Sequence, residues 1–385
     1  MQYYLHMVNR THWIALVEAA WRRRSVVWLS GVRRSGKTTL CRSLENVEYL
    51  DCELPRVRAR VQDPEGFLET VRGKRVALDE VHRLDRPSEI LKIAADHYPD
   101  VHVIATGSST LSATAKFADT LTGRKVDVRL TPMIEQDRID FGGTPIPDRL
   151  WRGGLPPFFL GDAGDGDFAE WVDSYWARDI QEMFRLEKRA AFGKFFELLL
   201  VNSGGVFEAT KYAAPCEVSR TTIGNYLDVL ETTSVVTVVR PFSTHRATEI
   251  VSAPKAYGFD TGFVRHFRGW AEPRPDDLGV LWEHYVLNEM KARLPEADVR
   301  YWRTKQHAEV DFVVLRRGKA PVAVECKLSA ANAGDLAGVS AFRKTYPEGE
   351  DFVVSADITE PFARSVKGRV VAFVGLADLL GRLGA

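Results

Sequence analysis

The residues best suited to chemistry lie near the start of the sequence, where residues 31–38 match the spacing G-x-x-x-x-G-K-[ST]. Two glycines let the backbone curl so that successive N–H groups point at a polyphosphate. Lys37 supplies a charge for the β- and γ-phosphates, and the Thr38 hydroxyl is placed to bind Mg²⁺. The residues expected to bind the nucleotide are Gly31, Arg33, Arg34, Ser35, Gly36, Lys37, Thr38 and Thr39.

A chance glycine-rich turn would give the same letters, but the flanking sequence argues against it. Residues 25–29 form a short apolar run that is typical of a buried strand, and residues 38–41 are suited to opening a helix. A strand before the loop and a helix after it are the setting in which such a loop binds phosphate.

A second chemical signal follows the loop, where an apolar run over residues 75–78 ends in Asp79 and Glu80. Asp79 would hold Mg²⁺ through water, and Glu80 would orient and polarise the attacking water as the catalytic base. A strand that ends in a solvated turn has the same pattern, so the run alone is a weak signal. After a phosphate-binding loop it predicts hydrolysis of ATP with Mg²⁺.

Two further residues are candidates for catalysis at this site. Residues 101–109 indicate another buried strand with a polar end, and in an ATPase with an extra strand between the loop strand and the acidic strand this end reaches the γ-phosphate. Ser108 is therefore a sensor candidate, although a helix N-cap is the alternative. Arg124 could act as an arginine finger, in the same chain or from a neighbour, but a surface arginine on a turn is at least as consistent with the sequence.

The last hundred residues carry an independent signal. Asp311 lies in an apparent strand, and Glu325-Cys326-Lys327 ends the next one, which is the layout of a PD-(D/E)XK nuclease. Glu325 and Lys327 point to the same side because alternate strand residues do. Joined by Glu283 from a preceding helix, the carboxylates would hold Mg²⁺, and Lys327 would position or activate a water. The alternative is two hairpin strands with polar outward faces.

Between these signals the sequence predicts mainly helices. Residues 7–24 and 171–186 are expected to be helical, and residues 279–294 to form an amphipathic helix. Strands are expected at residues 47–51, 235–239 and 309–314, with another starting at Tyr301, and a linker is expected around residues 273–277.

Residues 192–240 predict three helices followed by a strand, which is the order of a winged helix. Ser219 is expected to cap the last of these helices, as Ser and Thr do. The exposed start of that helix would carry Arg220, Thr221, Thr222 and Asn225, where a recognition helix contacts DNA. Because the helix has few basic residues, DNA binding and a role as a protein–protein spacer fit equally well.

Length and composition set the frame for these signals. A chain of 385 residues implies about two to four domains. Its 52 basic residues balance its 52 acidic residues, so any nucleic-acid binding must come from a local patch. The four cysteines form no C-x-x-C pair, which argues against a structural zinc site and a disulfide framework. No apolar stretch is long enough to span a bilayer, and the start lacks a signal-peptide core, so the cytoplasm is the expected location.

Together these motifs resemble the widespread prokaryotic group of AAA+-type ATPases that carry a C-terminal domain of unknown function. The matching stretches cover nearly the whole chain: residues 31–39, 78–82, 106–109, 123–124, 178–180, 257–262, 302–304, 309–312 and 324–327. The resemblance implies an ATPase core, a winged helix and a nuclease-like end. His82 and Cys326 depart from the usual pattern, which has Gln and often Val there, but neither is a predicted ligand.

The sequence thus predicts an α/β chain of four parts. These are a P-loop ATPase domain with a parallel sheet (residues 1–140), a helical region (141–190), a winged helix (191–270) and a restriction-endonuclease-like α/β domain (275–385). The expected function is a Mg²⁺-dependent ATPase acting on or near DNA, with coupling to a nuclease as the most concrete version. A nucleotide-switched regulator whose nuclease-like domain only binds DNA or protein, and an ATPase that works on protein partners alone, are the alternatives. A homo-oligomer is also a candidate assembly, and no membrane partner is expected.

Overall fold

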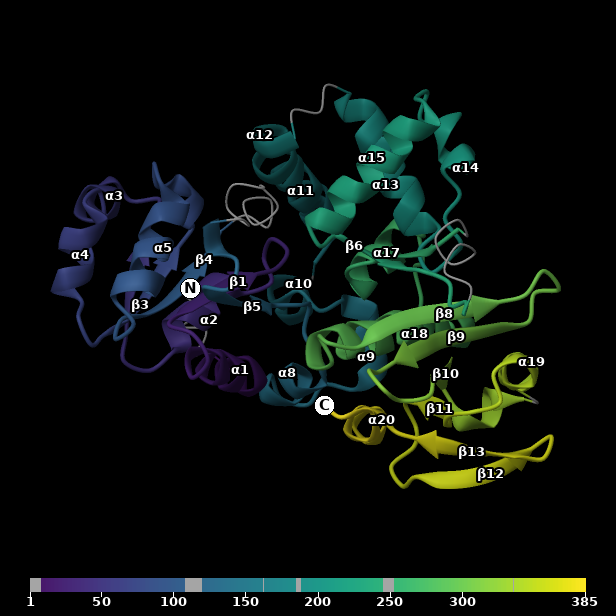
Figure 1. Ribbon diagram of the computed structural model, residues 1–385. Coiled ribbons are helices and arrows are strands. Elements are labelled where there is room, and N and C mark those ends of the chain that lie inside the picture. The colour runs from purple at the N-terminus through teal and green to yellow at the C-terminus, as the bar shows by residue number, and fades with distance from the viewer. Residues whose placement is uncertain (1–7, 108–119, 162, 185–187, 245–252, 335) are drawn as a thin grey trace. The chain divides into compact units, whose positions relative to one another are not determined.

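The computed structural model describes residues 8–107, 120–161, 163–184, 188–244, 253–334 and 336–385. The chain divides into two compact units, each with its own sheet (Figure 1). The first comprises residues 1–144, 155–187 and 232–234, and the second comprises residues 145–154, 188–231 and 235–385. The four-part division expected from the sequence stays a prediction.

The first unit is built on a five-stranded parallel sheet with the order β2-β3-β4-β1-β5. Its strands read as apolar runs because helices pack against the sheet, and four of the five residues in β1 are buried. The strands are β1 (Val26–Ser30), β2 (Val47–Asp51), β3 (Arg75–Asp79), β4 (His102–Thr106) and β5 (Lys125–Arg129). β4 lies between β1 and β3, which confirms the expected extra strand between the loop strand and the acidic strand.

Short helices connect these strands and extend the first unit. They are α1 (Thr11–Trp21), α2 (Lys37–Ser43), α3 (Pro55–Arg60), α4 (Pro64–Thr70), η1 (Val81–Arg83), α5 (Pro87–His97), α8 (Glu135–Asp140) and α10 (Pro156–Leu160). The helix expected over residues 171–186 is a composite of α11 (Asp165–Tyr175), the π-helical turn η2 (Trp176–Ile180) and α12 (Gln181–Phe184). Single π-turns of this kind are frequent at functional sites.

The second unit contains a mixed six-stranded sheet with the order β12-β13-β11-β10-β9-β8 and a two-stranded antiparallel pair, β6-β7. The strands are β6 (Val236–Val239), β7 (Lys255–Gly258), β8 (Asp298–Arg303), β9 (Glu309–Leu315), β10 (Val322–Lys327), β11 (Asp351–Ser355), β12 (Phe362–Val366) and β13 (Arg369–Val374). Tyr301 therefore lies near the end of a strand and does not start one, because pairing with β9 begins earlier, at Asp298.

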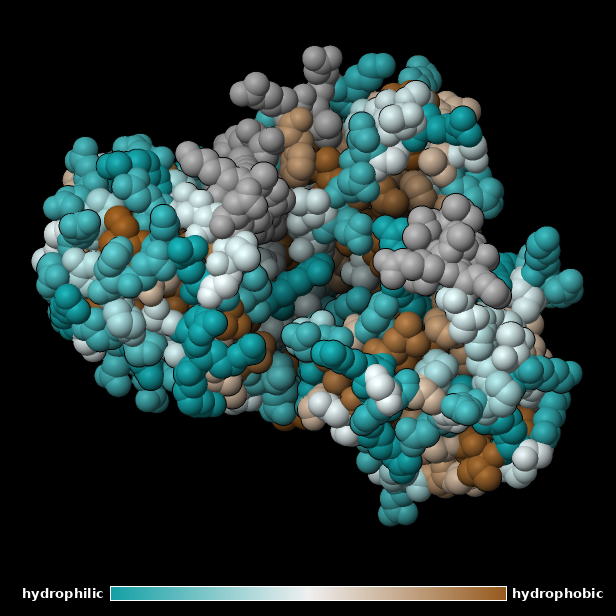
Figure 2. All heavy atoms as spheres, in the orientation of Figure 1, coloured by the Kyte–Doolittle hydropathy of each residue, from teal (hydrophilic) through white to brown (hydrophobic). Residues whose placement is uncertain are grey.

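The helices of the second unit are α9 (Ile146–Arg152), α13 (Arg189–Val201), α14 (Ala209–Ala213), α15 (Arg220–Thr232), α17 (Thr261–Phe267), α18 (Pro275–Arg293), η3 (Ala330–Ala333), α19 (Ala337–Thr345) and α20 (Leu376–Leu383). The Ser219 hydroxyl accepts from the Thr222 backbone N–H at 3.1 Å, which confirms the predicted cap of α15. The face seen in Figure 2 is mostly hydrophilic, and exposed apolar side chains on β12 and β13 include Phe362 and Val370.

Helix α18 differs from its prediction in two ways. It begins at Pro275, so the residues expected to form a linker open the helix, with proline at a position where its missing N–H costs nothing. It is also buried almost all round and is not amphipathic, because α9, α17, α20 and β10 all pack against it. Trp282 is fully buried there and donates from Nε1 to the Val354 carbonyl at 3.1 Å.

Candidate nucleotide-binding site

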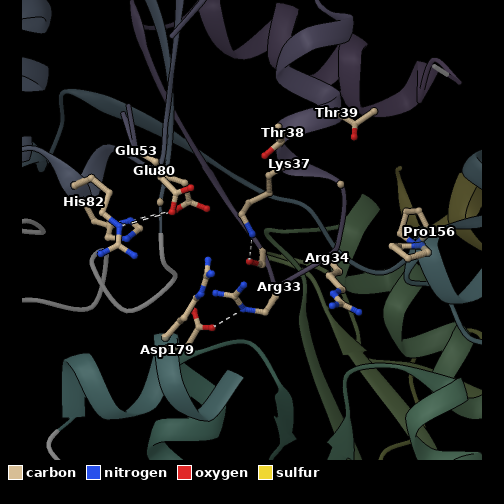
Figure 3. Close-up of a pocket in the computed structure, with 16 residues that line it drawn as sticks. Arg33, Arg34, Lys37, Thr38, Thr39, Glu53, Glu80, His82, Pro156 and Asp179 are labelled. Atoms are coloured by element: carbon tan, nitrogen blue, oxygen red, sulfur yellow. Dashed lines mark hydrogen bonds and ion pairs between the residues drawn. The ribbon is translucent and has the colours of Figure 1, made fainter. Parts of the chain in front are cut away.

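The loop between β1 and α2 lines a pocket of about 350 Å³ in the first unit (Figure 3). Glu80, which directly follows β3, and Arg178 and Asp179 from η2 line the same pocket. Of the residues predicted to bind nucleotide, the structure places these at the pocket: Gly31, Arg33, Arg34, Gly36, Lys37, Thr38 and Thr39. Their roles as ligands stay a prediction.

The two glycines of the loop are required by its backbone. Gly31 has a φ of +149°, and a Cβ atom there would lie 2.3 Å from the Leu130 carbonyl oxygen. Gly36 is left-handed, with a φ of +97°, immediately before α2. A side chain at either position would strain the loop or push it off β5, because only glycine adopts these conformations without cost.

Ser35 differs from the other predicted loop residues because its side chain is fully buried and does not line the pocket. Its carbonyl oxygen accepts from the Arg10 guanidinium at 2.7 Å, and Arg10 is itself bound to the buried carboxylate of Asp137 at 2.9 Å. The Trp13 indole N–H donates to the same carboxylate at 3.0 Å. This buried network of charge-assisted hydrogen bonds stabilises the loop backbone at Ser35.

Lys37 lies at the floor of the pocket, where its ammonium group donates to the Gly31 and Val32 carbonyl oxygens at 2.7 and 3.1 Å. Burial lowers the pKa of Lys37, while the charges of Glu80 and Asp179 raise it and that of Arg33 lowers it. In such a desolvated position, an anionic partner strongly stabilises the charged form of the lysine.

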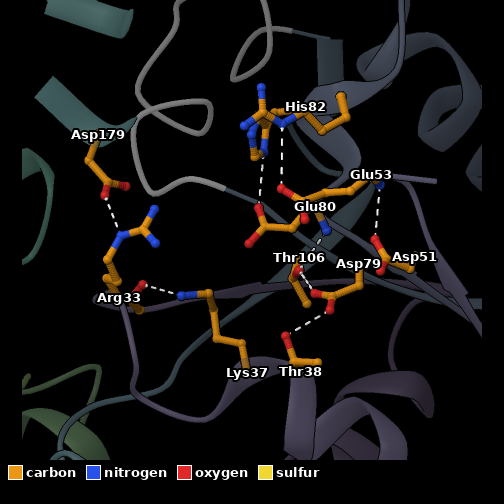
Figure 4. A network of polar contacts seen from close by, with 12 residues as sticks. Arg33, Lys37, Thr38, Asp51, Glu53, Asp79, Glu80, His82, Thr106 and Asp179 are labelled. Atoms are coloured by element: carbon orange, nitrogen blue, oxygen red, sulfur yellow. Dashed lines mark hydrogen bonds and ion pairs between the residues drawn. The ribbon is translucent and has the colours of Figure 1, made fainter. Parts of the chain in front are cut away.

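Three hydroxyl groups orient the carboxylate of Asp79, and Figure 4 shows those of Thr38 and Thr106. The Thr38 hydroxyl donates to it at 2.7 Å and the Tyr49 hydroxyl at 2.6 Å, and the Thr106 hydroxyl donates to its other oxygen. Burial and the hydrogen bond to Asp79 raise the pKa of Tyr49, so Tyr49 stays a donor. No motif pointed to Tyr49, whose place beside Asp79 depends on the pairing of β2 with β3.

Replacing Tyr49 with Phe should weaken the response of ATP hydrolysis to Mg²⁺ by roughly tenfold or more, because groups that orient a metal ligand contribute that much. The ring would still stack on Arg42, which lies 4.4 Å from its centroid, so packing is kept. The measurement is a Mg²⁺ titration of phosphate release. Tyr98→Phe is the matched control, since Tyr98 does not line the pocket. An unchanged titration in Tyr49→Phe would contradict this role.

Glu80 follows Asp79 in a left-handed conformation, with a φ of 54°. Its backbone N–H donates to the Thr106 hydroxyl at 3.1 Å, and its carboxylate lies 3.1 Å from Nδ1 of His82. Burial raises the pKa of Glu80, but the hydrogen bond and charge of His82, with the charges of Lys37 and Arg33, outweigh it and hold the pKa below its ordinary value. Glu80 is therefore ionised at neutral pH, as a base must be.

Of the other two predicted catalytic residues of this unit, the structure describes only Arg124, which does not line the pocket. Ser108 lies outside the described residues, although the preceding Thr106 and Gly107 lie at Asp79 and at the pocket. Arg124 precedes β5 at the amino end of the parallel sheet, whereas the loop follows the carboxyl end of β1. Its Nε donates to Asp96 at 2.7 Å. A finger acting in the same chain is therefore wrong, and one acting on a neighbouring molecule stays a prediction.

In the second unit, Lys255 lies beside one of the three predicted metal-binding carboxylates, Glu283. Its ammonium group pairs with Glu309 and lies 3.5 Å from Glu283, and Glu283 also accepts from the Tyr257 hydroxyl at 2.6 Å. Among the residues that the structure describes, no group of three or more His, Cys, Asp and Glu side chains is arranged to hold a metal ion. The three-carboxylate metal set is thus not assembled, because a lysine from β7 compensates part of the negative charge.

The remaining members of that cluster do interact. Lys327 donates to Glu325 at 2.7 Å, and Asp311 accepts from the Cys326 backbone N–H at 2.8 Å. Burial and the charge of Glu283 raise the pKa of Asp311 to about 7, and burial and the charge of Asp311 raise that of Glu325 to about 7. Burial lowers the pKa of Lys327, but the two carboxylates outweigh it and raise it overall.

The fold and the pocket define the first unit as a P-loop ATPase domain of the AAA class. A family model described as an AAA domain matches residues 23–137. Two models of domains of unknown function, DUF8612 and DUF4143, match residues 144–274 and 278–371. Among the helices that the structure describes, none combines the length and the apolar character needed to cross a membrane.

The chain belongs to the family of two mycobacterial proteins. The uncharacterized proteins Rv2008c of Mycobacterium tuberculosis and Mb2031c of Mycobacterium bovis are each 30% identical to it over 334 residues, which are 83% of this chain and 74% of theirs. The Walker-type ATPase PABY2304 of Pyrococcus abyssi aligns with a TM-score of 0.44 and 14% identity, over 68% of this chain and 96% of its own. A structural likeness at that level does not bear on function.

Proposed function

We propose that the chain is a Mg²⁺-dependent ATP hydrolase and that its site is the pocket of the first unit. The observation that carries the proposal is the buried carboxylate of Asp79, which lies 2.7 Å from the Thr38 hydroxyl while Lys37 and Glu80 line the same pocket. This set provides a phosphate-binding charge, two oxygen ligands and a base, which are the parts that phosphoryl transfer to water requires.

The residues present fit a magnesium ion. Mg²⁺ prefers hard oxygen ligands, which the Thr38 hydroxyl and the Asp79 carboxylate supply side by side. When held by Thr38 and Asp79, the ion would offset the negative charge that develops on the phosphates. Lys37 would hold the same phosphates, and Glu80 would accept a proton from the attacking water.

Phosphate release by the purified full-length chain tests the proposal. The rate should be measured with Mg²⁺ and with EDTA, each with and without double-stranded DNA. We expect release in Mg²⁺ that stops in EDTA. A chain that binds ATP tightly but releases no phosphate would instead support the nucleotide-switched regulator.

We further propose DNA as a partner, with α15 as the contacting helix. The order α13, α14, α15 and then the β6-β7 pair is that of a winged helix, and Arg220 and Thr221 are exposed at the start of α15. The AAA domain itself does not distinguish DNA from protein as the partner, so this step depends on the helix.

Reversing one charge on α15 tests that step. Arg220→Glu should weaken DNA binding uniformly across sequences and reduce the slope of log affinity against log salt by roughly one or more, because neutralised phosphates set that slope. Fluorescence anisotropy of a labelled duplex at several salt concentrations provides the measurement. Lys74→Glu, an exposed residue of the first unit, is the control. Equal curves for both variants would favour the protein-spacer alternative.

For the six-stranded sheet, Lys255 favours binding over cutting. A metal-dependent nuclease needs carboxylates free to share an ion, whereas Lys255 already takes up Glu283 and Glu309. We therefore propose that this nuclease-like part only binds DNA or protein and does not cleave DNA. Incubation of supercoiled DNA with the chain in Mg²⁺ or Mn²⁺ should leave it intact. Cutting that is lost in both Asp311→Ala and Lys327→Ala would establish the nuclease instead.

A further inference from the structure

Within the first unit, the helical segment α11–η2 contacts both arginines of the phosphate loop. The Trp171 indole N–H donates to the Arg33 carbonyl oxygen at 3.1 Å, and Nε of Arg33 donates to the Asp179 carboxylate at 3.1 Å. Glu170 pairs with Arg34. The segment therefore contacts the loop at three points. Trp171 binds the loop backbone, and Asp179 and Glu170 pair with the two arginine side chains.

The Arg33–Asp179 pair differs from the Arg34–Glu170 pair in its surroundings. The side chain of Asp179 is 13% exposed and lines the pocket, whereas that of Glu170 is 65% exposed and does not. Asp179 belongs to the π-turn η2, and Figures 3 and 4 show its carboxylate directed at Arg33, with Lys37 on the other side of the guanidinium. The pair thus lies inside the nucleotide pocket.

The charge of Arg33 acts on the groups expected to surround the terminal phosphate. It lowers the pKa of Lys37 and that of Glu80, so it lies within electrostatic reach of both the phosphate-binding lysine and the expected base. A γ-phosphate bound by Lys37 with its attacking water at Glu80 would lie between these residues. Arg33 is then close to the one phosphate that distinguishes ATP from ADP.

We propose that Arg33 detects the γ-phosphate by exchanging its partner, from the Asp179 carboxylate to the phosphate, so that Asp179 sets the preference of the site between ATP and ADP. This rests on the proposed ATP-binding function of the pocket. A phosphate group carries more charge than a carboxylate and accepts two parallel N–H bonds from a guanidinium, so it competes well for Arg33. ADP lacks that group, and Arg33 then stays with Asp179.

The exchange would also change how the π-turn η2 is held. Release of Asp179 removes its contact from η2 to the loop, while the contact of Trp171 in α11 to the Arg33 backbone remains. The triphosphate state and the diphosphate state would then differ in how η2 is held, which is a differential contact of the kind that a nucleotide switch requires.

Equilibrium titrations with the β,γ-imido analogue of ATP and with ADP test the exchange. Asp179→Asn should tighten the analogue about five- to tenfold, because its competitor for Arg33 is weakened, and should leave ADP unchanged. Arg33→Gln should weaken the analogue and not ADP. In the double variant the Asp179 substitution should have no further effect, since its partner is gone.

Asp173→Asn is the matched control, because it removes a charge from an exposed residue of the same helical segment that does not line the pocket. An unchanged ratio of the two affinities in Asp179→Asn, or additive effects in the double variant, would overturn the exchange. Failure of the wild-type chain to bind either nucleotide would overturn the proposed function itself, so the two outcomes are separable.

Discussion

Replacing Lys37 with Ala should remove ATP binding at the concentrations that saturate the wild-type chain. The ammonium group is partly buried at the floor of the pocket, and among the residues that the structure describes no other lysine lines it. A hydrogen bond to a charged group contributes about 1.5–3 kcal/mol, and Lys37 is expected to make more than one to the phosphates. We therefore expect affinity to fall by on the order of a hundredfold.

A titration with a fluorescent ATP analogue measures this loss. Lys74→Ala is the control, because Lys74 is exposed and does not line the pocket. Thermal unfolding of both variants shows whether the fold is kept. Wild-type affinity in a folded Lys37→Ala protein would mean that the nucleotide binds elsewhere.

Replacing Glu80 with Gln should leave ATP binding nearly intact but slow hydrolysis by roughly 10²- to 10⁴-fold, the usual contribution of a positioned base. The amide keeps the shape of the side chain and can still contact His82, so the change removes the negative charge and with it the ability to accept a proton. Phosphate release and analogue binding should be measured on the same preparation. Glu65→Gln, an exposed residue of α4, is the control.

Two outcomes would contradict this role for Glu80. Hydrolysis at the wild-type rate would place the base elsewhere. Loss of binding together with hydrolysis, in a folded protein, would mean that Glu80 contributes to holding the nucleotide and is not a base alone.

The core of the first unit could be predicted because its signals are local. The spacing of the loop glycines with Lys37, and the apolar run that ends in Asp79, are each contained within a few residues. The position of β4 between the strands that carry them also followed, since the sequence shows a third buried run with a polar end. Parallel strands then bring their carboxyl ends together at one edge.

The rest of the pocket depends on contacts that sequence spacing does not encode. Tyr49 reaches Asp79 only because β2 pairs with β3, and Asp179 reaches Arg33 across 146 positions of the chain.

The second unit shows the same limit more sharply. The spacing of Asp311, Glu325 and Lys327 predicted a cluster, and the structure does couple their charges. The spacing could not reveal Lys255, which lies on β7 and forms an ion pair with Glu283. A compensating charge from a distant element changes what a set of carboxylates can bind.

A single-turnover experiment tests the central claim, that this pocket hydrolyses ATP with Glu80 as the base. The wild-type and Glu80→Gln chains, each in excess over ATP in Mg²⁺, would be sampled for cleavage of the bound nucleotide. This separates cleavage from binding and product release. We expect the wild-type chain to convert its bound ATP to ADP and phosphate and the variant to retain its ATP intact. Intact ATP on both proteins, or equal conversion by both, would contradict it.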